Sequence, residues 1–73
     1  MPLVDTLPVD TIRIGPRLRD LDDTKVGELV ASVRVQGLLQ PLVVTESGDL
    51  VAGLHRLEAV KALGWTEVPV VVV

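Results

Sequence analysis

The stretch from Val51 to Ala59 combines residue types that bind anions. It predicts a short strand, then Gly53, then the first turn of a helix. No Ser, Thr, Asp or Asn precedes this helix, so its first backbone N–H groups have no expected side-chain partner. Arg56, and His55 if charged, also stand at the positive end of the helix dipole, where a cation is unfavourable. Unpaired N–H donors, a glycine and a nearby arginine together suit a phosphate group.

Each of these residues also has an interpretation without a ligand. Gly53 could simply begin a helix after a strand, and Arg56 could lie in solvent with its stem on a sheet. The unfavourable position of Arg56 on the dipole favours phosphate binding. His55 stays open, because it could donate to a phosphate oxygen or merely fill the first turn. The predicted cradle consists of the backbone N–H groups from Gly53 through Leu54 and His55 to Arg56.

Two other groups could close one side of this cradle. Gln40 precedes a proline in a predicted turn, where its amide could contact a ligand or water. Arg13, Arg17 and Arg19 form a basic cluster in a predicted loop. A solvated loop is the ordinary interpretation, and the alternative is that Arg17 or Arg19 meets the phosphate.

The sequence assigns no catalytic residue and no metal ligand. Glu46, Asp49 and Glu58 follow no metal-binding motif, and a phosphotransferase would need a metal-holding carboxylate and a general base near the cradle. His55 is the only candidate base in this region. The pattern therefore favours a binding module over an enzyme, and leaves the ligands of an accompanying Mg²⁺ unknown.

Composition limits the alternatives. The chain has 73 residues, which indicates one domain with a small core, and Trp65 is its only aromatic residue. The net charge of −3 lacks the basic excess of a DNA-binding surface. With no cysteine, disulfides, thiolate metal sites and cysteine nucleophiles are excluded. No apolar run spans a membrane and no secretion signal is visible, so we expect a soluble, cytoplasmic domain.

The predicted elements alternate between strand and helix. Residues 3–12 form an extended edge segment, with Val9–Ile12 the best strand candidate. A first helix begins near residues 22–24 and ends before Gly37. Its apolar stripe recurs at i, i+3, i+4 and i+7, at Val26, Leu29, Val30 and Val33.

The second half of the chain continues this alternation. Residues 42–44 and 50–52 predict a hairpin, and a second helix runs from Leu54 to Leu63. Residues 68–73 form a last strand, either buried on both faces or left as a bare edge that invites pairing. The order is β-α-β-β-α-β. We therefore predict an α/β (α+β) fold: a small mixed sheet with two packed helices.

These motifs, in this order, resemble the N-terminal domain of the ParB/sulfiredoxin superfamily. The matching segments are Gly37–Pro41 (GLLQP), Gly53–Arg56 (GLHR), Leu63–Trp65 (LGW) and the valine-rich end. The resemblance covers roughly Leu7 to Val73. It implies a nucleotide whose phosphates lie at the glycine–helix junction: CTP in chromosome-partition members, ATP in sulfiredoxin and ADP in a free-serine kinase. It also implies that Gln40 lies close to the nucleotide.

Departures from the family pattern limit what the resemblance implies. Sulfiredoxin carries a reactive cysteine in the glycine motif, and this chain has none, which excludes sulfinic-acid reductase activity. Partition proteins usually have a glutamate and two arginines after the glycine, where this chain has Leu54, His55 and Arg56. Their later acidic-Asn-Gln motif, DNA reader and dimerisation tail are also absent from these 73 residues.

Three functions follow from the sequence. The first, which we favour, is a module that binds a nucleoside triphosphate (CTP or ATP) with Mg²⁺, in a DNA-partition or regulatory DNA-binding system, with DNA contacted indirectly or through other domains. The second is a phosphotransferase or slow nucleotidase. The third is an interaction module that forms a homodimer through the last strand. An end within an apolar strand also suits a truncated or engineered piece of a longer protein.

Overall fold

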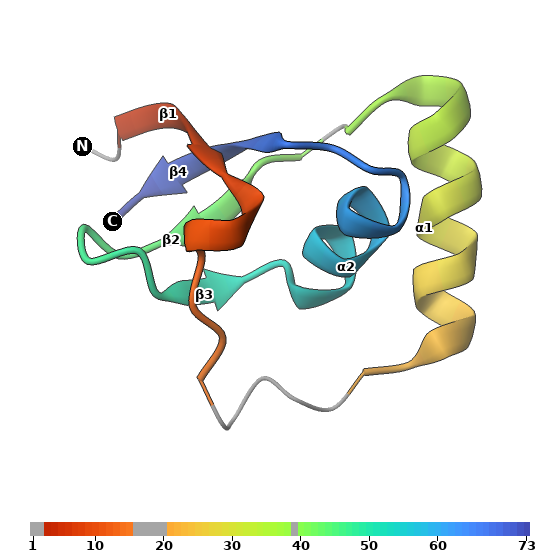
Figure 1. Ribbon diagram of the computed structural model, residues 1–73, viewed down its shortest axis with the longest axis horizontal. Coiled ribbons are helices and arrows are strands. Elements are labelled where there is room, and N and C mark those ends of the chain that lie inside the picture. The colour runs from red at the N-terminus through yellow and green to blue at the C-terminus, as the bar shows by residue number, and fades with distance from the viewer. Residues whose placement is uncertain (1–2, 16–20, 39) are drawn as a thin grey trace.

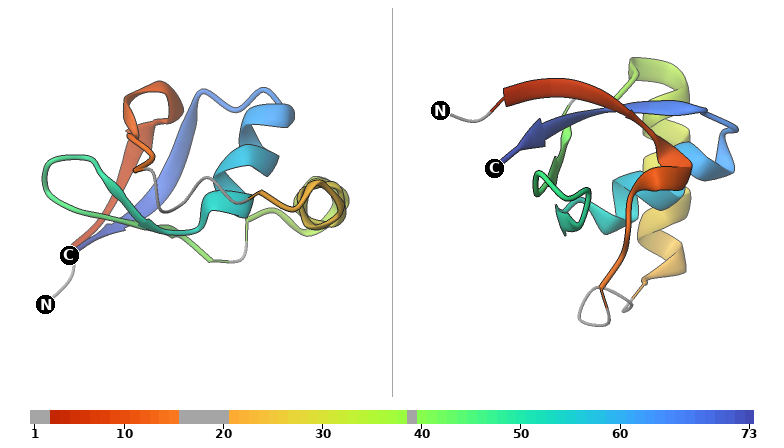
Figure 2. Two further views of the ribbon diagram at one scale, coloured as in Figure 1. Left: turned by 90° about the horizontal axis from the view of Figure 1, so that it is seen from below. Right: turned by 60° about the vertical axis from the view of Figure 1, so that its left-hand side comes forward.

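The computed structural model describes residues 3–15, 21–38 and 40–73, and for Leu3 and Val4 only the backbone. A sheet, a short helix packed on it and a longer outer helix follow one another across the molecule (Figures 1 and 2). The strands are β1 (Leu3–Pro8), β2 (Leu42–Val44), β3 (Leu50–Ala52) and β4 (Glu67–Val72). The helices are η1 (Val9–Thr11), α1 (Asp23–Gln36) and α2 (Leu54–Ala62). The predicted order and the mixed α/β class are confirmed.

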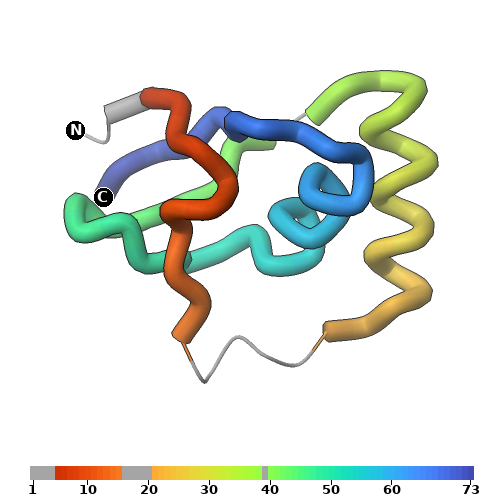
Figure 3. The backbone as a smooth tube through the Cα atoms, in the orientation of Figure 1, coloured from red at the N-terminus to blue at the C-terminus, as the bar shows by residue number. Residues whose placement is uncertain are grey.

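The four strands form a single sheet in the order β1-β4-β2-β3. β4 runs antiparallel to β1 and parallel to β2, and β2 and β3 form the predicted antiparallel hairpin. The parallel pair β2 and β4 is joined through β3 and α2, so α2 is the crossover helix and covers one face of the sheet. The path is easiest to follow in the tube of Figure 3.

The prediction that the last strand offers a bare edge is wrong. β4 lies inside the sheet, where β1 pairs with it on one side and β2 on the other. The other alternative, burial on both faces, holds fully for one face: Val68 and Val70 have no exposed surface, whereas Pro69 and Val71 on the opposite face are half-buried. A homodimer through this strand is therefore not available, because its backbone N–H and C=O groups already pair within the chain.

The first strand lies earlier than predicted. The edge segment is confirmed, but its strand is Leu3–Pro8, whereas Val9–Thr11 forms a turn of 3₁₀ helix. Val9 and Ile12 are 5% and 6% exposed, because residues three apart lie on the same side of a 3₁₀ turn. The Thr11 hydroxyl donates to the Pro8 carbonyl at 2.8 Å and stabilises this turn. Burial of two β-branched residues therefore overrode their strand propensity.

The start of α1 and the C-terminal ends of both helices agree with the sequence. Asp22 caps α1, and its carboxylate accepts from the backbone N–H groups of Thr24 and Lys25. Gly37, with φ of 76°, follows the last residue of α1. After α2, the Gly64 N–H donates to Lys61 and the Trp65 N–H donates to Val60, the pair of bonds of a Schellman motif. Trp65 thus folds back and packs against the core.

The core lies between α2 and the sheet. Leu57 and Val60 of α2 and Leu42 and Val44 of β2 have no exposed surface. α1 packs on α2 (Figure 2), and of its predicted stripe only Val33 is fully buried, while Val26, Leu29 and Val30 are half-buried. The outer helix is therefore held by a single thin layer of contacts. Within the described residues, no helix is long and apolar enough to cross a membrane.

We predict that Leu57→Ala lowers the free energy of unfolding by about 2–5 kcal/mol, because it leaves a cavity at the centre of the contact between α2 and the sheet. Val35→Ala is the control, since Val35 is 83% exposed on α1. Urea denaturation followed by circular dichroism measures both. Equal, small losses for the two variants would contradict this assignment of the core.

Candidate functional site

Gly53 forms the junction between β3 and α2. Its φ of 106° and ψ of 27° are left-handed, a conformation that side chains other than glycine rarely adopt. It occupies the cap position of α2 and makes no side-chain hydrogen bond to the first turn. The prediction of a helix start without a side-chain cap is therefore confirmed.

Close packing also requires glycine here. A Cβ at position 53 would lie 2.6 Å from Cδ2 of Leu42 and 3.3 Å from Nη2 of Arg56. Leu42 is completely buried in β2 and cannot easily move away. The absent side chain thus lets the junction lie directly on the sheet, with the Arg56 guanidinium against its backbone.

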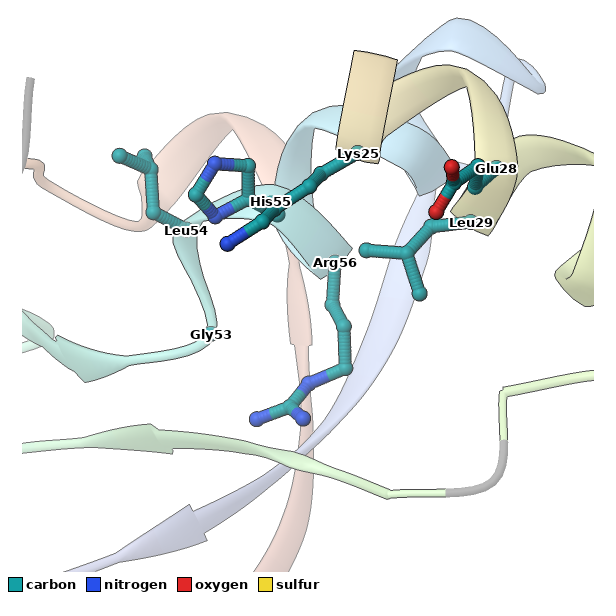
Figure 4. Close-up of a pocket in the computed structure, with 7 residues that line it drawn as sticks. All are labelled: Lys25, Glu28, Leu29, Gly53, Leu54, His55 and Arg56. Carbon is teal, nitrogen blue, oxygen red and sulfur yellow. The ribbon is translucent and has the colours of Figure 1, made fainter. Parts of the chain in front are cut away.

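Arg56 extends from α2 towards the sheet, beneath the Gly53 junction (Figure 4). Its Nη1 donates to Oε1 of Gln40 at 2.9 Å, so the structure brings these two predicted site residues together. Its Nε is buried and has no hydrogen-bond partner among the described residues. A buried donor without a partner costs about 1–3 kcal/mol, which makes it a marker of a missing acceptor.

His55 has a partner that the sequence did not predict. Its Nε2 accepts a hydrogen bond from the backbone N–H of Asp22 at 3.0 Å. The imidazole therefore links the first turn of α2 to the cap of α1.

α1 supplies one wall of the cleft at this junction. A cavity of about 530 Å³ is lined by Lys25, Glu28 and Leu29 of α1 together with the Gly53–Arg56 segment. Figure 4 shows Lys25 extending from α1 towards the first turn of α2. Sequence reasoning missed Lys25 and Glu28. Their spacing with Leu29 placed them on one helix face, but nothing local indicated that this face meets the glycine junction.

A smaller cavity of about 190 Å³ adjoins the first, and both are lined by Leu29 and Arg56. Its other walls include Ser32 on α1 and Gln40 before β2. The guanidinium of Arg56 thus lies between a cationic cleft and a mainly apolar one. A ligand with an anionic part and a flat apolar part would match the two.

The predicted basic cluster is divided. Arg17 and Arg19 lie outside the described residues. Arg13 is turned towards the hairpin, where Nε pairs with Oδ1 of Asp49 at 2.8 Å and Nη2 donates to the Ser47 carbonyl at 2.6 Å. The hydrogen bond from Arg13 and its positive charge lower the pKa of Asp49, and the same hydrogen bond and the negative charge of Asp49 raise the pKa of Arg13. Arg13 thus holds the start of the loop against the hairpin.

The carboxylates do not gather into a metal site. Oε1 of Glu58 lies 3.9 Å from Nζ of Lys61, one turn away on α2. Asp22 caps α1. Among the described residues, no group of three or more His, Cys, Asp or Glu side chains could hold a metal ion.

Three features characterise this site: the uncapped glycine junction, the arginine beneath it and the Gln-Pro turn that precedes β2. The ParB N-terminal domain family matches residues 2–73 of the chain. The chain belongs to this family. A ParB N-terminal domain is found in partitioning and nucleoid occlusion proteins, as the curated relatives below indicate.

Two of these relatives show the extent of the similarity. A nucleoid occlusion protein of Geobacillus kaustophilus is 40% identical over 73 residues, which cover 90% of this chain and 26% of that protein. A probable plasmid-partitioning protein ParB of Deinococcus radiodurans is 47% identical over 73 residues, which cover 92% of this chain and 25% of that protein. The chain thus spans about a quarter of the length of these relatives.

Two solved structures share the fold. Sulfiredoxin from Arabidopsis thaliana has a TM-score of 0.85 and 34% identity, and the match covers 99% of this chain and 85% of that one. A C-terminally truncated chromosome-partitioning protein ParB from Caulobacter crescentus, complexed with CTP-γ-S, has a TM-score of 0.84 and 27% identity. That match covers 96% of this chain and 43% of the other. The resemblance seen in the sequence is confirmed.

We predict that Gly53→Ala destabilises this ParB N-terminal domain by about 1–3 kcal/mol more than Gly64→Ala does. Both glycines have positive φ and both substitutions strain the backbone, but a Cβ at Gly64 meets nothing within 4 Å. Only the first substitution forces Leu42 to move. Thermal denaturation of the two variants measures the difference, and equal losses would show that the junction does not pack tightly.

We also predict a pH dependence from the Arg13–Asp49 pair. Because the pKa of Asp49 is lowered from its ordinary value of 3.8, the pair stabilises the fold above that value, and its contribution disappears as the pH falls through the lowered pKa. The melting temperature of Asp49→Asn should therefore lie below that of the wild type at neutral pH and approach it in acid. Glu46→Gln, in the same turn, is the charge-matched control. A difference that persists in acid would contradict this.

Proposed function

We propose that this ParB N-terminal domain binds a nucleoside triphosphate, with its phosphates at the start of α2. The proposal rests on Nε of Arg56, which is buried and has no hydrogen-bond partner among the described residues. It lies beside an uncapped helix N-terminus, and a phosphate oxygen would satisfy both the guanidinium and the free backbone N–H groups. No side chain in the described part of the chain caps this helix start, as expected of a site that receives its acceptor from a ligand.

Charge around the cleft supports an anion. Arg56 and Lys25 bring positive charge to a domain whose net charge is −3. Among the described residues, Glu28 is the one acidic side chain that lines the cavity. A single carboxylate suits Mg²⁺ that is held mainly by the ligand's own phosphates and by water. We therefore include Mg²⁺ as a companion of the phosphates, with Glu28 as the residue nearest to such an ion.

The shape of the site supports a nucleotide over a free phosphate. The main cavity of about 530 Å³ has the size of an ordinary small-molecule site. The adjoining apolar cavity offers room for part of a base or sugar, and Gln40 contributes an amide there. Gln40 also holds Nη1 of Arg56, so it orients the guanidinium as well as facing the ligand.

CTP is our first candidate and ATP the second. The Caulobacter ParB with the same fold is complexed with CTP-γ-S. The sulfiredoxin similarity extends to the fold but not to sulfur chemistry, because this chain has no cysteine. We propose binding without a catalytic residue, since the one imidazole at the site is engaged by the Asp22 N–H.

The relatives suggest the wider setting. Because they are named as nucleoid occlusion and plasmid-partitioning proteins, we propose that the domain serves a DNA-partition or nucleoid-occlusion system. The net charge of −3 lacks the basic excess of a DNA-binding domain. Contact with DNA would then be made through other parts of a longer protein.

We predict that calorimetry detects binding of CTP, ATP or pyrophosphate in the presence of Mg²⁺, and that Arg56→Ala weakens it about 10- to 150-fold. This is the factor expected when charge-assisted hydrogen bonds worth about 1.5–3 kcal/mol are lost. The affinity of Arg56→Lys should lie between those of the wild type and Arg56→Ala, because lysine keeps the positive charge but lacks the planar guanidinium group. A preference for CTP over ATP would support the partition context.

Arg34→Ala is the matched control, because Arg34 is an exposed arginine in the last turn of α1 and does not line either cavity. Circular dichroism confirms that each variant is folded. The proposal fails if the wild type binds none of the three ligands at millimolar concentration, or if the Arg34 and Arg56 variants lose affinity equally.

A further inference from the structure

The hydrogen bond between His55 and Asp22 joins two helix starts that the sequence places far apart. The Asp22 backbone donates to the imidazole, while the Asp22 carboxylate accepts from Thr24 and Lys25. His55 of α2 is thus hydrogen-bonded to the backbone of Asp22, the residue that caps α1. Lys25 and Glu28, which follow directly, form the α1 wall of the cleft.

This bond requires an unprotonated Nε2. A nitrogen that accepts a hydrogen bond carries no proton. A second proton on the ring would make Nε2 a donor, and two donors, Nε2–H and the Asp22 N–H, would then face each other without an acceptor. A histidine that binds phosphate as a cation needs that second proton. His55 therefore cannot hold α1 and act as a cationic phosphate ligand in the same state.

We propose that His55 is a positioning residue, which acts through Asp22 in its neutral form and holds the α1 wall of the cleft against the start of α2. Protonation of the ring releases that wall and weakens binding, although it adds positive charge to the site. This role rests on the proposed function of the cleft. It is the answer that we propose to the question that the sequence left open about His55.

The charges that face the imidazole are mixed. Lys25 and Glu28 of α1 line the same cavity as His55. Asp22, the N-cap residue of α1, donates to the ring, and Arg56 follows His55 on α2. None of the strands contributes a titratable side chain to the described lining. These are the charged groups around the ring in the described part of the chain, together with the hydrogen bond that it accepts from the Asp22 N–H.

Two variants separate the roles of the ring. His55→Gln can place an amide oxygen near the position of Nε2, so it keeps an acceptor that does not titrate. His55→Phe keeps a flat ring of similar size and has no acceptor. The first test is made without a ligand: the amide signal and hydrogen exchange of Asp22 are followed by nuclear magnetic resonance from about pH 8 to about pH 5.5, the range in which histidine changes charge.

We expect protection of the Asp22 amide in the wild type to disappear on acidification. It should stay in His55→Gln and be absent throughout in His55→Phe. An Asp22 amide that exchanges equally fast in all three proteins at pH 8 would overturn the positioning role, whatever the cleft binds.

The second test measures the dissociation constant of inorganic pyrophosphate for the wild type and for His55→Gln over the same range. Protonation of pyrophosphate affects both proteins alike, so the ratio of the two constants reports on His55. We expect the wild type to weaken about fivefold relative to His55→Gln as the pH falls, the factor given by one net hydrogen bond.

A wild type that instead binds more tightly than His55→Gln in acid would identify His55 as a cationic phosphate ligand and overturn the proposal. A protected Asp22 amide in a protein that binds no pyrophosphate would leave the link between the helices intact and overturn the nucleotide-binding function and the role of His55 in it. The two tests thus distinguish failure of the hydrogen bond from failure of the site.

Discussion

The close approach of Gly53 to Leu42 is the contact on which the site depends. With no side chain at this position, the chain leaves β3 in a left-handed conformation and begins α2 directly on the buried face of β2. That placement buries Nε of Arg56 beneath the junction, where it has no hydrogen-bond partner among the described residues. The same contact therefore fixes the helix against the core and creates an unsatisfied donor beside free backbone N–H groups.

Two helix starts meet at this place, and the protein treats them differently. Asp22 satisfies the first N–H groups of α1 with its own carboxylate, whereas Gly53 leaves those of α2 open. A small domain has a low free energy of unfolding, and an uncapped, cationic helix start lowers it further. A bound anion would offset this loss of stability. His55 connects the capped start to the open one, which ties the shape of the cleft to the position of the outer helix.

Local patterns predicted most of the elements and failed where burial competed with propensity. The start of the first helix near residues 22–24, its end before Gly37 and the hairpin each follow from residues adjacent in the chain, and all are confirmed. Val9–Ile12 was predicted as a strand and forms a 3₁₀ turn, because two apolar residues three apart were drawn into the core. The apolar last strand allowed two interpretations, and only the sheet order showed that it is central.

The sequence by itself determined the chemistry of the site: a glycine that only a special backbone needs, a helix start without a cap, and an arginine at the wrong end of a dipole. These are local features, set by residue type and spacing. Tertiary structure alone decided which side chains share the cleft. Lys25, Glu28 and the Asp22 N–H reach the start of α2 because α1 packs on it, and Gln40 reaches Arg56 because the chain returns to the sheet there. Such contacts depend on packing between distant segments, which no local pattern encodes.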